Sequence, residues 1–166
     1  LEVPGRELDG VHFAMEYLYG RNRWVAESQG RVAKHAEREI SAAGKRVVVI
    51  GGGDTSIDVA TVARRLGHIG HAKPTDFPEL AIGGHMAHDV ASVSAKQGAE
   101  VTLTSVFDVN KMQANQHEIE QALAEGIAIR GGLAPVRVVK DAGGRAIALV
   151  VARCEAKFVG PRLEIK

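Results

Sequence analysis

Residues 45–58 read KRVVVIGGGDTSID, and this stretch decides the fold that the sequence predicts. The run RVVVI at 46–50 is apolar and β-branched, as expected of a central parallel strand that is covered on both faces. Three glycines follow it, and the residues after them carry apolar side chains at helical spacing as far as residue 66. The pattern therefore predicts a strand, a tight glycine turn and a helix at 54–66, in the order of a βα unit.

The glycine turn has the composition of a phosphate-binding loop. A strand, a tight turn and a helix bring backbone N–H groups and the positive end of the helix dipole to one point, which attracts a pyrophosphate. Gly51 would permit the tight turn, and Gly53 would let the phosphates approach the backbone. The third small position of a dinucleotide fingerprint falls on Ser56, which is small enough for the helix to pack on the strand. The same pattern also fits a glycine turn that only packs a strand against a helix, so the motif leaves both interpretations open.

The composition is that of a single globular domain. The chain has 166 residues, of which 45% are hydrophobic and 25% charged, and its net charge is +1. Such a small net charge gives no reason to expect nucleic acid or an anionic membrane as a partner, and no apolar run is long enough to cross a bilayer. The one cysteine, Cys154, cannot form an internal disulfide and is expected to be buried. We therefore expect a cytoplasmic protein.

The remaining segments predict a mixed α/β architecture. A short helix is expected to begin near Phe13 and to end at Gly20, followed by loose helix or surface chain to residue 43. A strand at 100–106 precedes a helix at 115–126, where Asn115 and Glu118 form a capping-box pattern. A short strand at 127–130 and two strands joined by the turn DAGG complete the chain. Together these elements predict an α/β, Rossmann-like three-layer domain with a parallel core sheet and an antiparallel hairpin.

Several segments resemble, in the same order, the small flavin-containing subunit of glutamate synthase and its relatives among the FAD-dependent pyridine nucleotide oxidoreductases. They run from Val3 to about Ile129 and read VPGRELDGVHFAMEYL, GKRVVVIGGGDTSIDVA, RLG, GAEVTL and ANQHEIEQALAEGI. The resemblance implies that the chain is the inserted NAD(P)H-binding domain of such a protein, which suits its start at Leu1 and its end after RLEI. The implied divisions are a linker and helical segment at 1–44, the NAD(P)H-binding domain at 45–154, and a return linker toward an absent FAD domain at 155–166.

The resemblance implies a hydride relay. NAD(P)H would dock on the glycine loop, hydride would pass to FAD held by the rest of the parent protein, and electrons would continue toward an iron–sulfur or large-subunit partner. We therefore assign no catalytic residue and no metal ligand, and expect the isolated chain to bind a nucleotide, to bind no FAD and to catalyse nothing. The candidate cofactor-binding residues are Gly51, Gly52, Gly53, Asp54, Thr55, Ser56, Ser105, Phe107 and Asp108.

The chain departs from the family at the place where NADPH-using relatives carry two arginines. Aligned on MQAN at 112–115, these positions hold Val106 and Phe107. A guanidinium pairs with a 2′-phosphate, whereas a carboxylate such as Asp108 can accept a hydrogen bond from a ribose 2′-OH. The missing arginines favour NAD(H) over NADP(H). The alternative is that Asp108 is a solvated turn residue and that Lys111 contacts the phosphate.

An insert at 68–97 carries the histidines His68, His71, His85 and His88, in two H-x-x-H pairs. Imidazoles bind zinc, but no cysteine accompanies them and the segment is rich in glycine and proline, so we expect an exposed loop. Such a loop could contact the FAD domain or a partner. This leaves an alternative function, a Rossmann-like docking module with weak or lost nucleotide binding that acts in subunit or domain interaction.

Overall fold

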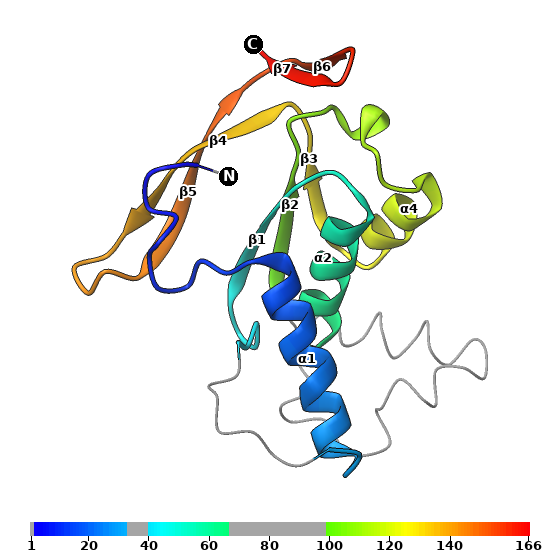
Figure 1. Ribbon diagram of the computed structural model, residues 1–166, viewed down its shortest axis with the longest axis vertical. Helices are drawn as coiled ribbons and strands as arrows, with labels where there is room; N and C mark the ends of the chain where they lie inside the picture. The colour runs from blue at the N-terminus through cyan, green and yellow to red at the C-terminus, as the bar shows by residue number, and fades with distance from the viewer. Residues whose placement is uncertain (1, 33–39, 67–98) are drawn as a thin grey trace.

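The computed structural model describes residues 2–32, 40–66 and 99–166. Its centre is a parallel sheet with the strand order β1-β2-β3, formed by β1 (Arg46–Ile50), β2 (Glu100–Thr104) and β3 (Ala128–Arg130). β1 pairs with β2 along its whole length, and β3 pairs with the second half of β2. The strands therefore end at the same edge of the sheet, where the glycine loop leaves β1 (Figure 1).

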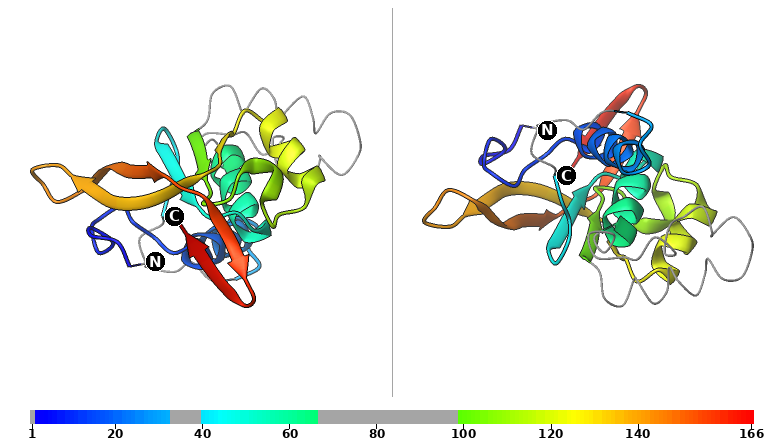
Figure 2. Two further views of the ribbon diagram at one scale, coloured as in Figure 1. Left: turned by 90° about the horizontal axis from the view of Figure 1, so that it is seen from above. Right: turned by 90° about the horizontal axis from the view of Figure 1, so that it is seen from below.

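The helices of the described ranges pack on one face of this sheet. They are α1 (Ala14–Ser28), α2 (Asp54–Leu66) and α4 (Gln116–Ala124), with a short 3-10 helix η3 (Val109–Lys111) before α4. α2 lies in the middle and contacts β1, β2, α1 and α4 (Figures 1 and 2). The buried core joins Val49 and Leu103 of the sheet to Ile57, Ala60 and Ile119 of the helices.

β1 differs from the central, doubly covered strand that the sequence predicts. It forms an edge of the described sheet, and its side chains alternate in exposure: Val49 is 7% exposed, whereas Val48 is 47% and Ile50 is 39% exposed. The described residues thus form two layers, helices on one face of a sheet, and do not supply a third. A continuous apolar run favours a strand that is covered on both faces, but the coverage itself depends on what packs there, and the described residues cover only one face of β1. The predicted α/β class, parallel core and antiparallel hairpin are confirmed.

α1 is longer than the sequence predicts. The helix continues through Gly20 and ends at Ser28. A glycine inside a helix costs about 1 kcal/mol relative to alanine, which is why Gly20 looked like a terminus. Tyr17 and Arg21 are buried on either side of it, and α1 packs against α2, so tertiary contacts offset this penalty.

Two antiparallel hairpins follow the parallel sheet. The first pairs β4 (Leu133–Lys140) with β5 (Ala146–Arg153), as predicted, and the Asp141 carboxylate accepts hydrogen bonds from Gly143 N–H and Arg145 N–H at 2.9 Å in the turn. The second pairs β6 (Ala156–Val159) with β7 (Arg162–Ile165), within the segment interpreted as a return linker. In Figure 1 it lies above the carboxyl edge of the parallel sheet.

The N-terminal loop runs beside the first hairpin. Val138 N–H donates to the Pro4 carbonyl at 2.9 Å, and Ala146 N–H donates to the Asp9 carbonyl at 2.8 Å. Residues 2–10 therefore contact β4 and β5 (Figure 1).

The predicted insert at 68–97, with its four histidines, lies outside the described residues. None of the helices that the structure describes is long and apolar enough to span a bilayer.

Candidate functional site

The glycine loop connects β1 to α2 at the carboxyl edge of the sheet. Gly51 N–H donates to the Thr104 carbonyl at 2.9 Å and continues the pairing with β2, and the Gly53 carbonyl accepts from Ser56 N–H at 2.9 Å as α2 begins. Four consecutive N–H groups between these bonds have no acceptor in the described part of the chain, those of Gly52, Gly53, Asp54 and Thr55. Because they lie at the positive end of a 13-residue helix, they form a site suited to an anion.

The three glycines of the loop meet different surroundings. Gly51 has a φ of 149°, and a Cβ atom placed on it would overlap the Ser56 hydroxyl. A Cβ on Gly52 would lie 2.6 Å from the Ser105 hydroxyl. A Cβ on Gly53 would have no atom within 4 Å, so it would project into open space over the loop. Gly51 and Gly52 are thus required for packing, whereas Gly53 leaves room for a ligand to approach the backbone.

Asp54 has a partner inside the protein. Its Oδ1 accepts from Asn115 N–H at 2.9 Å, and the Gly52 carbonyl accepts from Ala114 N–H at 3.0 Å. These two bonds join the glycine loop to the segment before α4. Thr55, the next residue along, is exposed.

The same contact corrects the predicted capping box of α4. Asn115 caps the helix as expected, because its Oδ1 accepts from His117 N–H at 2.9 Å. The second half of the box would have Glu118 accept from Asn115 N–H, but Asp54 takes that place. One carboxylate oxygen of Glu118 is buried and has no hydrogen-bond partner in the described ranges.

Ser105, Phe107 and Asp108 lie on the turn that follows β2, named here the 105–108 loop. Ser105 is buried, and its hydroxyl accepts a hydrogen bond from Phe107 N–H at 3.1 Å. The same hydroxyl lies beside Gly52, so Ser105 packs between the 105–108 loop and the glycine loop. The ring of Phe107 stacks on Phe158 of β6, with ring centroids 5.4 Å apart and an angle of 27° between the rings. The structure therefore brings the candidate residues of both segments to one edge of the sheet.

The charged groups of the 105–108 loop are solvent-accessible. Asp108 and Lys111 both have exposed side chains, and Lys111 Nζ lies 3.5 Å from Asp108 Oδ2. An exposed pair of this kind contributes at most about 1 kcal/mol, so either group can change partners at little cost. Burial, and secondly the charge of Asp108, raise the pKa of the nearby Cys154 thiol. This thiol donates to the Val106 carbonyl at 3.6 Å.

Two residues at this edge were not anticipated. Phe158 reaches the 105–108 loop from a strand 50 residues downstream, and no local pattern marks such a contact. Gly131 packs directly against the backbone at the end of the 105–108 loop, so that a Cβ atom on it would lie 2.6 Å from Val109 N. For Gly131, the pair of consecutive glycines at 131–132 was the sequence feature that could have indicated a close backbone contact.

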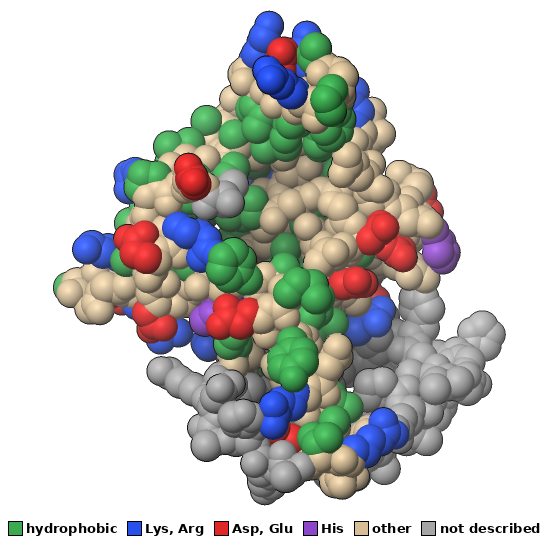
Figure 3. Space-filling view, in the orientation of Figure 1, with side chains coloured by type: hydrophobic (Ala, Val, Ile, Leu, Met, Phe, Trp, Pro, Cys, Tyr) green, Lys and Arg blue, Asp and Glu red, His purple; other side chains and the backbone are tan. Residues whose placement is uncertain are grey.

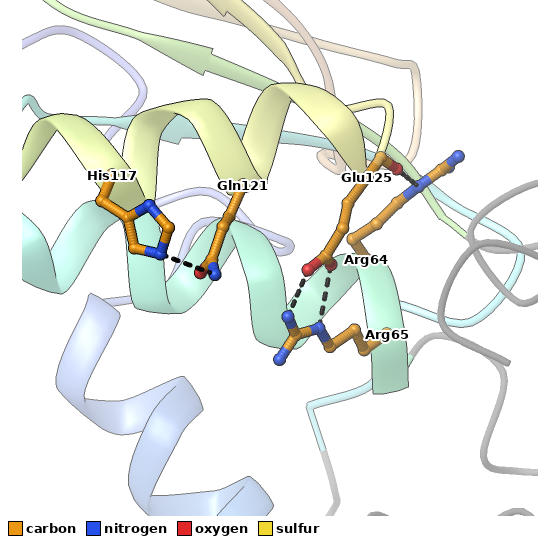
Figure 4. Close-up of polar contacts among 5 residues, drawn as sticks. All are labelled: Arg64, Arg65, His117, Gln121 and Glu125. Carbon is orange, nitrogen blue, oxygen red and sulfur yellow. Dashed lines mark hydrogen bonds and ion pairs between the residues drawn. The ribbon is translucent and has the colours of Figure 1, made fainter. Parts of the chain in front are cut away.

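Away from the loop, an arginine pair fastens the far ends of α2 and α4. Arg64 donates to the Glu125 carbonyl at 3.1 Å and to the Ala99 carbonyl at 2.6 Å. Arg65 binds the Glu125 carboxylate through two nitrogens, one of them Nε at 2.9 Å (Figure 4). Within the ranges that the structure describes, no three His, Cys, Asp or Glu side chains gather as metal ligands would.

Comparison with known proteins finds sequence similarity to the glutamate synthases. No protein-family model matches the chain. The glutamate synthase (NADPH) small chain of Mycobacterium tuberculosis is 48% identical over 69 residues, which cover 42% of this chain and 14% of that protein. This chain is related to the glutamate synthase small chain. The resemblance inferred from the sequence motifs is thereby confirmed.

A second glutamate synthase is similar in sequence, and a solved structure is similar in fold. Glutamate synthase (NADH) of Schizosaccharomyces pombe is 40% identical over 67 residues, covering 40% of this chain and 3% of that protein. The structure of Mycobacterium tuberculosis FprA in complex with NADPH superposes with a TM-score of 0.58 at 14% identity, covering 100% of this chain and 43% of FprA. At that identity the likeness shows the fold alone, and the fold is the predicted Rossmann-like one. The chain thus spans less than half the length of each of these proteins.

Proposed function

We propose that this chain binds a pyridine dinucleotide, NAD(H) or NADP(H), for a flavin-dependent oxidoreductase. The observation that carries the proposal is the glycine loop, where four unpaired N–H groups at the start of α2 surround the open space at Gly53. A pyrophosphate is the ligand whose charge and acceptor atoms match such a loop at the end of a parallel strand. The name of a relative supports this, because it is an NADPH glutamate synthase, and a neighbour in fold, FprA, was solved in complex with NADPH.

The candidate residues fit the two ends of an adenine dinucleotide. The N–H groups of residues 52–55 would hold the pyrophosphate, and the exposed Thr55 hydroxyl is available beside them. The 105–108 loop lies at the end of the neighbouring strand, where the adenosine ribose is recognised in domains of this fold. Ser105 and Ser56 support the site through packing, and Asp54 holds the loop to the segment before α4.

The bound nicotinamide supplies the hydride chemistry, while the residues of this chain provide binding and orientation. As in the glutamate synthase small subunit, the acceptor would be FAD held by the rest of a parent protein, with an iron–sulfur or large-subunit partner beyond it. No residue of the chain is assigned as an acid, a base or a nucleophile. The isolated chain is accordingly expected to bind nucleotide without turnover.

The proposed preference is for NAD(H). Val106 and Phe107 stand where NADPH-using relatives would carry arginines, and the exposed carboxylate of Asp108 would repel a 2′-phosphate. Lys111 is already within 3.5 Å of that carboxylate, which partly neutralises it. The names of the relatives lean against this preference: the small chains of Mycobacterium tuberculosis, Bacillus subtilis and Escherichia coli are NADPH enzymes, whereas the Schizosaccharomyces pombe protein is an NADH enzyme.

The test is a titration of the wild type, Gly53→Ala and Gly20→Ala with NADH and with NADPH. Binding is monitored through the chemical shifts of the backbone amides. Shifts should appear at residues 50–58 and 104–111, and Gly53→Ala should weaken binding by about tenfold or more, or about 1.4 kcal/mol, with an unchanged spectrum of the free protein. Gly20→Ala is the matched control, because a Cβ on this α1 residue meets no atom within 4 Å. Wild-type spectra that do not change at millimolar nucleotide would instead support the docking module. Tighter binding of NADPH would overturn the NAD(H) preference alone.

A further inference from the structure

The β6–β7 hairpin has one apolar face and one mostly charged face. Residues directly opposite each other in an antiparallel pair share a face, and successive pairs alternate. The apolar face is formed by two such pairs, Phe158 with Leu163 and Ala156 with Ile165. The other face is formed by Lys157 with Glu164 and Val159 with Arg162. Figure 3 shows apolar side chains at the top of the molecule, beside and just below several Lys and Arg side chains.

The contact between Phe158 and Phe107 shows where the apolar face points. It is directed at the 105–108 loop, and the hairpin extends over the side of the sheet on which α1 and α2 pack (Figure 2). About half of the face is nevertheless not covered by described residues, since Phe158 is 52%, Leu163 44% and Ile165 47% exposed. A two-stranded hairpin gains little stability by itself, so an open apolar face of this kind can gain from a flat apolar ligand.

We propose that Phe158, together with Phe107, forms a stacking platform for the adenine ring of the bound dinucleotide. This inference rests on the proposed function and adds a residue from a separate hairpin to the site. A purine offers a flat π-face that stacks on aromatic side chains irrespective of what the ribose carries. Phe158 therefore contributes affinity common to NAD(H) and NADP(H), and Asp108 and Lys111 distinguish the two at the ribose.

Ser105 links the platform to the glycine loop. Ser105 touches both parts of the site, because its hydroxyl accepts from Phe107 N–H at 3.1 Å and lies 2.6 Å from the Cβ position of Gly52. The buried Ser105 side chain thus contacts both the backbone of Phe107 and the turn at Gly52. In dinucleotide-binding domains the adenosine extends from the pyrophosphate toward the end of the second strand, which here is the 105–108 loop.

The experiment compares Phe158→Ala with Val159→Ala, a control on the opposite face of the same hairpin. Binding of NADH, 5′-AMP and inorganic pyrophosphate is measured by calorimetry. Phe158→Ala should weaken NADH and 5′-AMP by roughly tenfold and leave pyrophosphate, which has no base, unchanged. Phe158→Tyr should restore binding, and Val159→Ala should behave as the wild type.

The outcomes separate this inference from the proposed function. Wild-type protein that binds neither NADH nor pyrophosphate contradicts the proposed function itself. Equal affinity of Phe158→Ala and wild type for NADH contradicts the platform and leaves the function standing. Loss of pyrophosphate binding along with NADH also contradicts the platform, because it would mean that Phe158 only supports the shape of the loop.

Discussion

Gly51 and Gly53 are two residues apart, yet a side chain would clash at Gly51 and would have open space at Gly53. The first has a positive φ and faces Ser56, so the serine at the third position of the motif fits because Gly51 has no Cβ. The second has ordinary backbone geometry and open space around it. The motif therefore combines one glycine that the packing of the loop requires with one that leaves open space beside the loop.

Replacement of Gly51 by alanine should destabilise the protein by about 1–3 kcal/mol, because it adds an unfavourable φ to a clash with Ser56. Gly53→Ala should change the free energy of unfolding by less than about 1 kcal/mol, since neither cost arises there. Urea unfolding of the two variants measures the difference. Equal destabilisation would mean that the loop geometry described for Gly53 is wrong.

The charge of Asp108 should also be measurable through its effect on the pKa of the Cys154 thiol. Its negative charge is the second cause, after burial, of the raised pKa of that thiol. Asp108→Asn removes the repulsion of the thiolate, so the pKa of Cys154 should fall and alkylation near neutral pH should become a few-fold faster. The pH profile of the iodoacetamide reaction measures this, with Asp141→Asn as a distant control. An unchanged profile would show that the two side chains do not interact.

At the scale of elements, α2 and α4 are joined at both ends by different means. Near the glycine loop the joint is made by Asp54 and the backbone before α4, and at the far end by Arg64, Arg65 and Glu125. The Glu125 carboxylate is nearly buried, whereas Arg65 is half-exposed. Removal of the arginine would leave a carboxylate with little access to water.

Arg65→Ala should therefore destabilise the protein by about 1–2 kcal/mol, at the lower end of values for buried charged pairs because Arg65 is partly solvated. In a Glu125→Gln background the same change should cost clearly less. Arg23→Ala, which removes the i,i+4 pair with Glu27 at 3.0 Å on α1, should cost about 0.5 kcal/mol or less. Similar losses for Arg65 and Arg23 in urea unfolding would contradict the role given to the far-end joint.

The elements that the sequence predicted well are those with local signals. β1 and α2 follow from an apolar run, a glycine turn and a helical repeat, and the β4–β5 hairpin follows from its DAGG turn. The errors arose where a distant residue decides the outcome. Packing against α2 carries α1 past Gly20, and Asp54 takes the place that Glu118 would have had in the capping box. Similarly, the glycine loop could be predicted from its own residues, whereas the Phe107–Phe158 contact joins strands remote in sequence.

At the scale of the whole molecule, the described chain has a parallel α/β core and an attached β4–β5 hairpin. The N-terminal loop contacts the hairpin through Pro4 and Asp9, and Gly5 is the tightest point of this contact. Gly5 has a φ of 88°, and a Cβ on it would lie 2.8 Å from the Val138 carbonyl oxygen. A substitution at Gly5 should therefore perturb the contact between the N-terminal loop and the β4–β5 hairpin without changing the parallel core.

Gly5→Ala should weaken the contact between the N-terminal loop and the hairpin by about 1–3 kcal/mol, because alanine is strained at this φ. Hydrogen exchange should become faster at the amides of Val138 and Ala146, which donate to this loop, and stay unchanged in β2. Gly20→Ala again serves as the control. Faster exchange throughout β2 would show that the loop and the core unfold together.

The bonds from Ala114 to Gly52 and from Asn115 to Asp54 have a further consequence. They hold the glycine loop in its anion-accepting shape from the side opposite to β1. A ligand would thus meet a preorganised backbone and lose little conformational entropy to ordering it. The same bonds make the start of α4 part of the loop's support, so under the proposed function Asn115 would influence phosphate binding through its bond to Asp54.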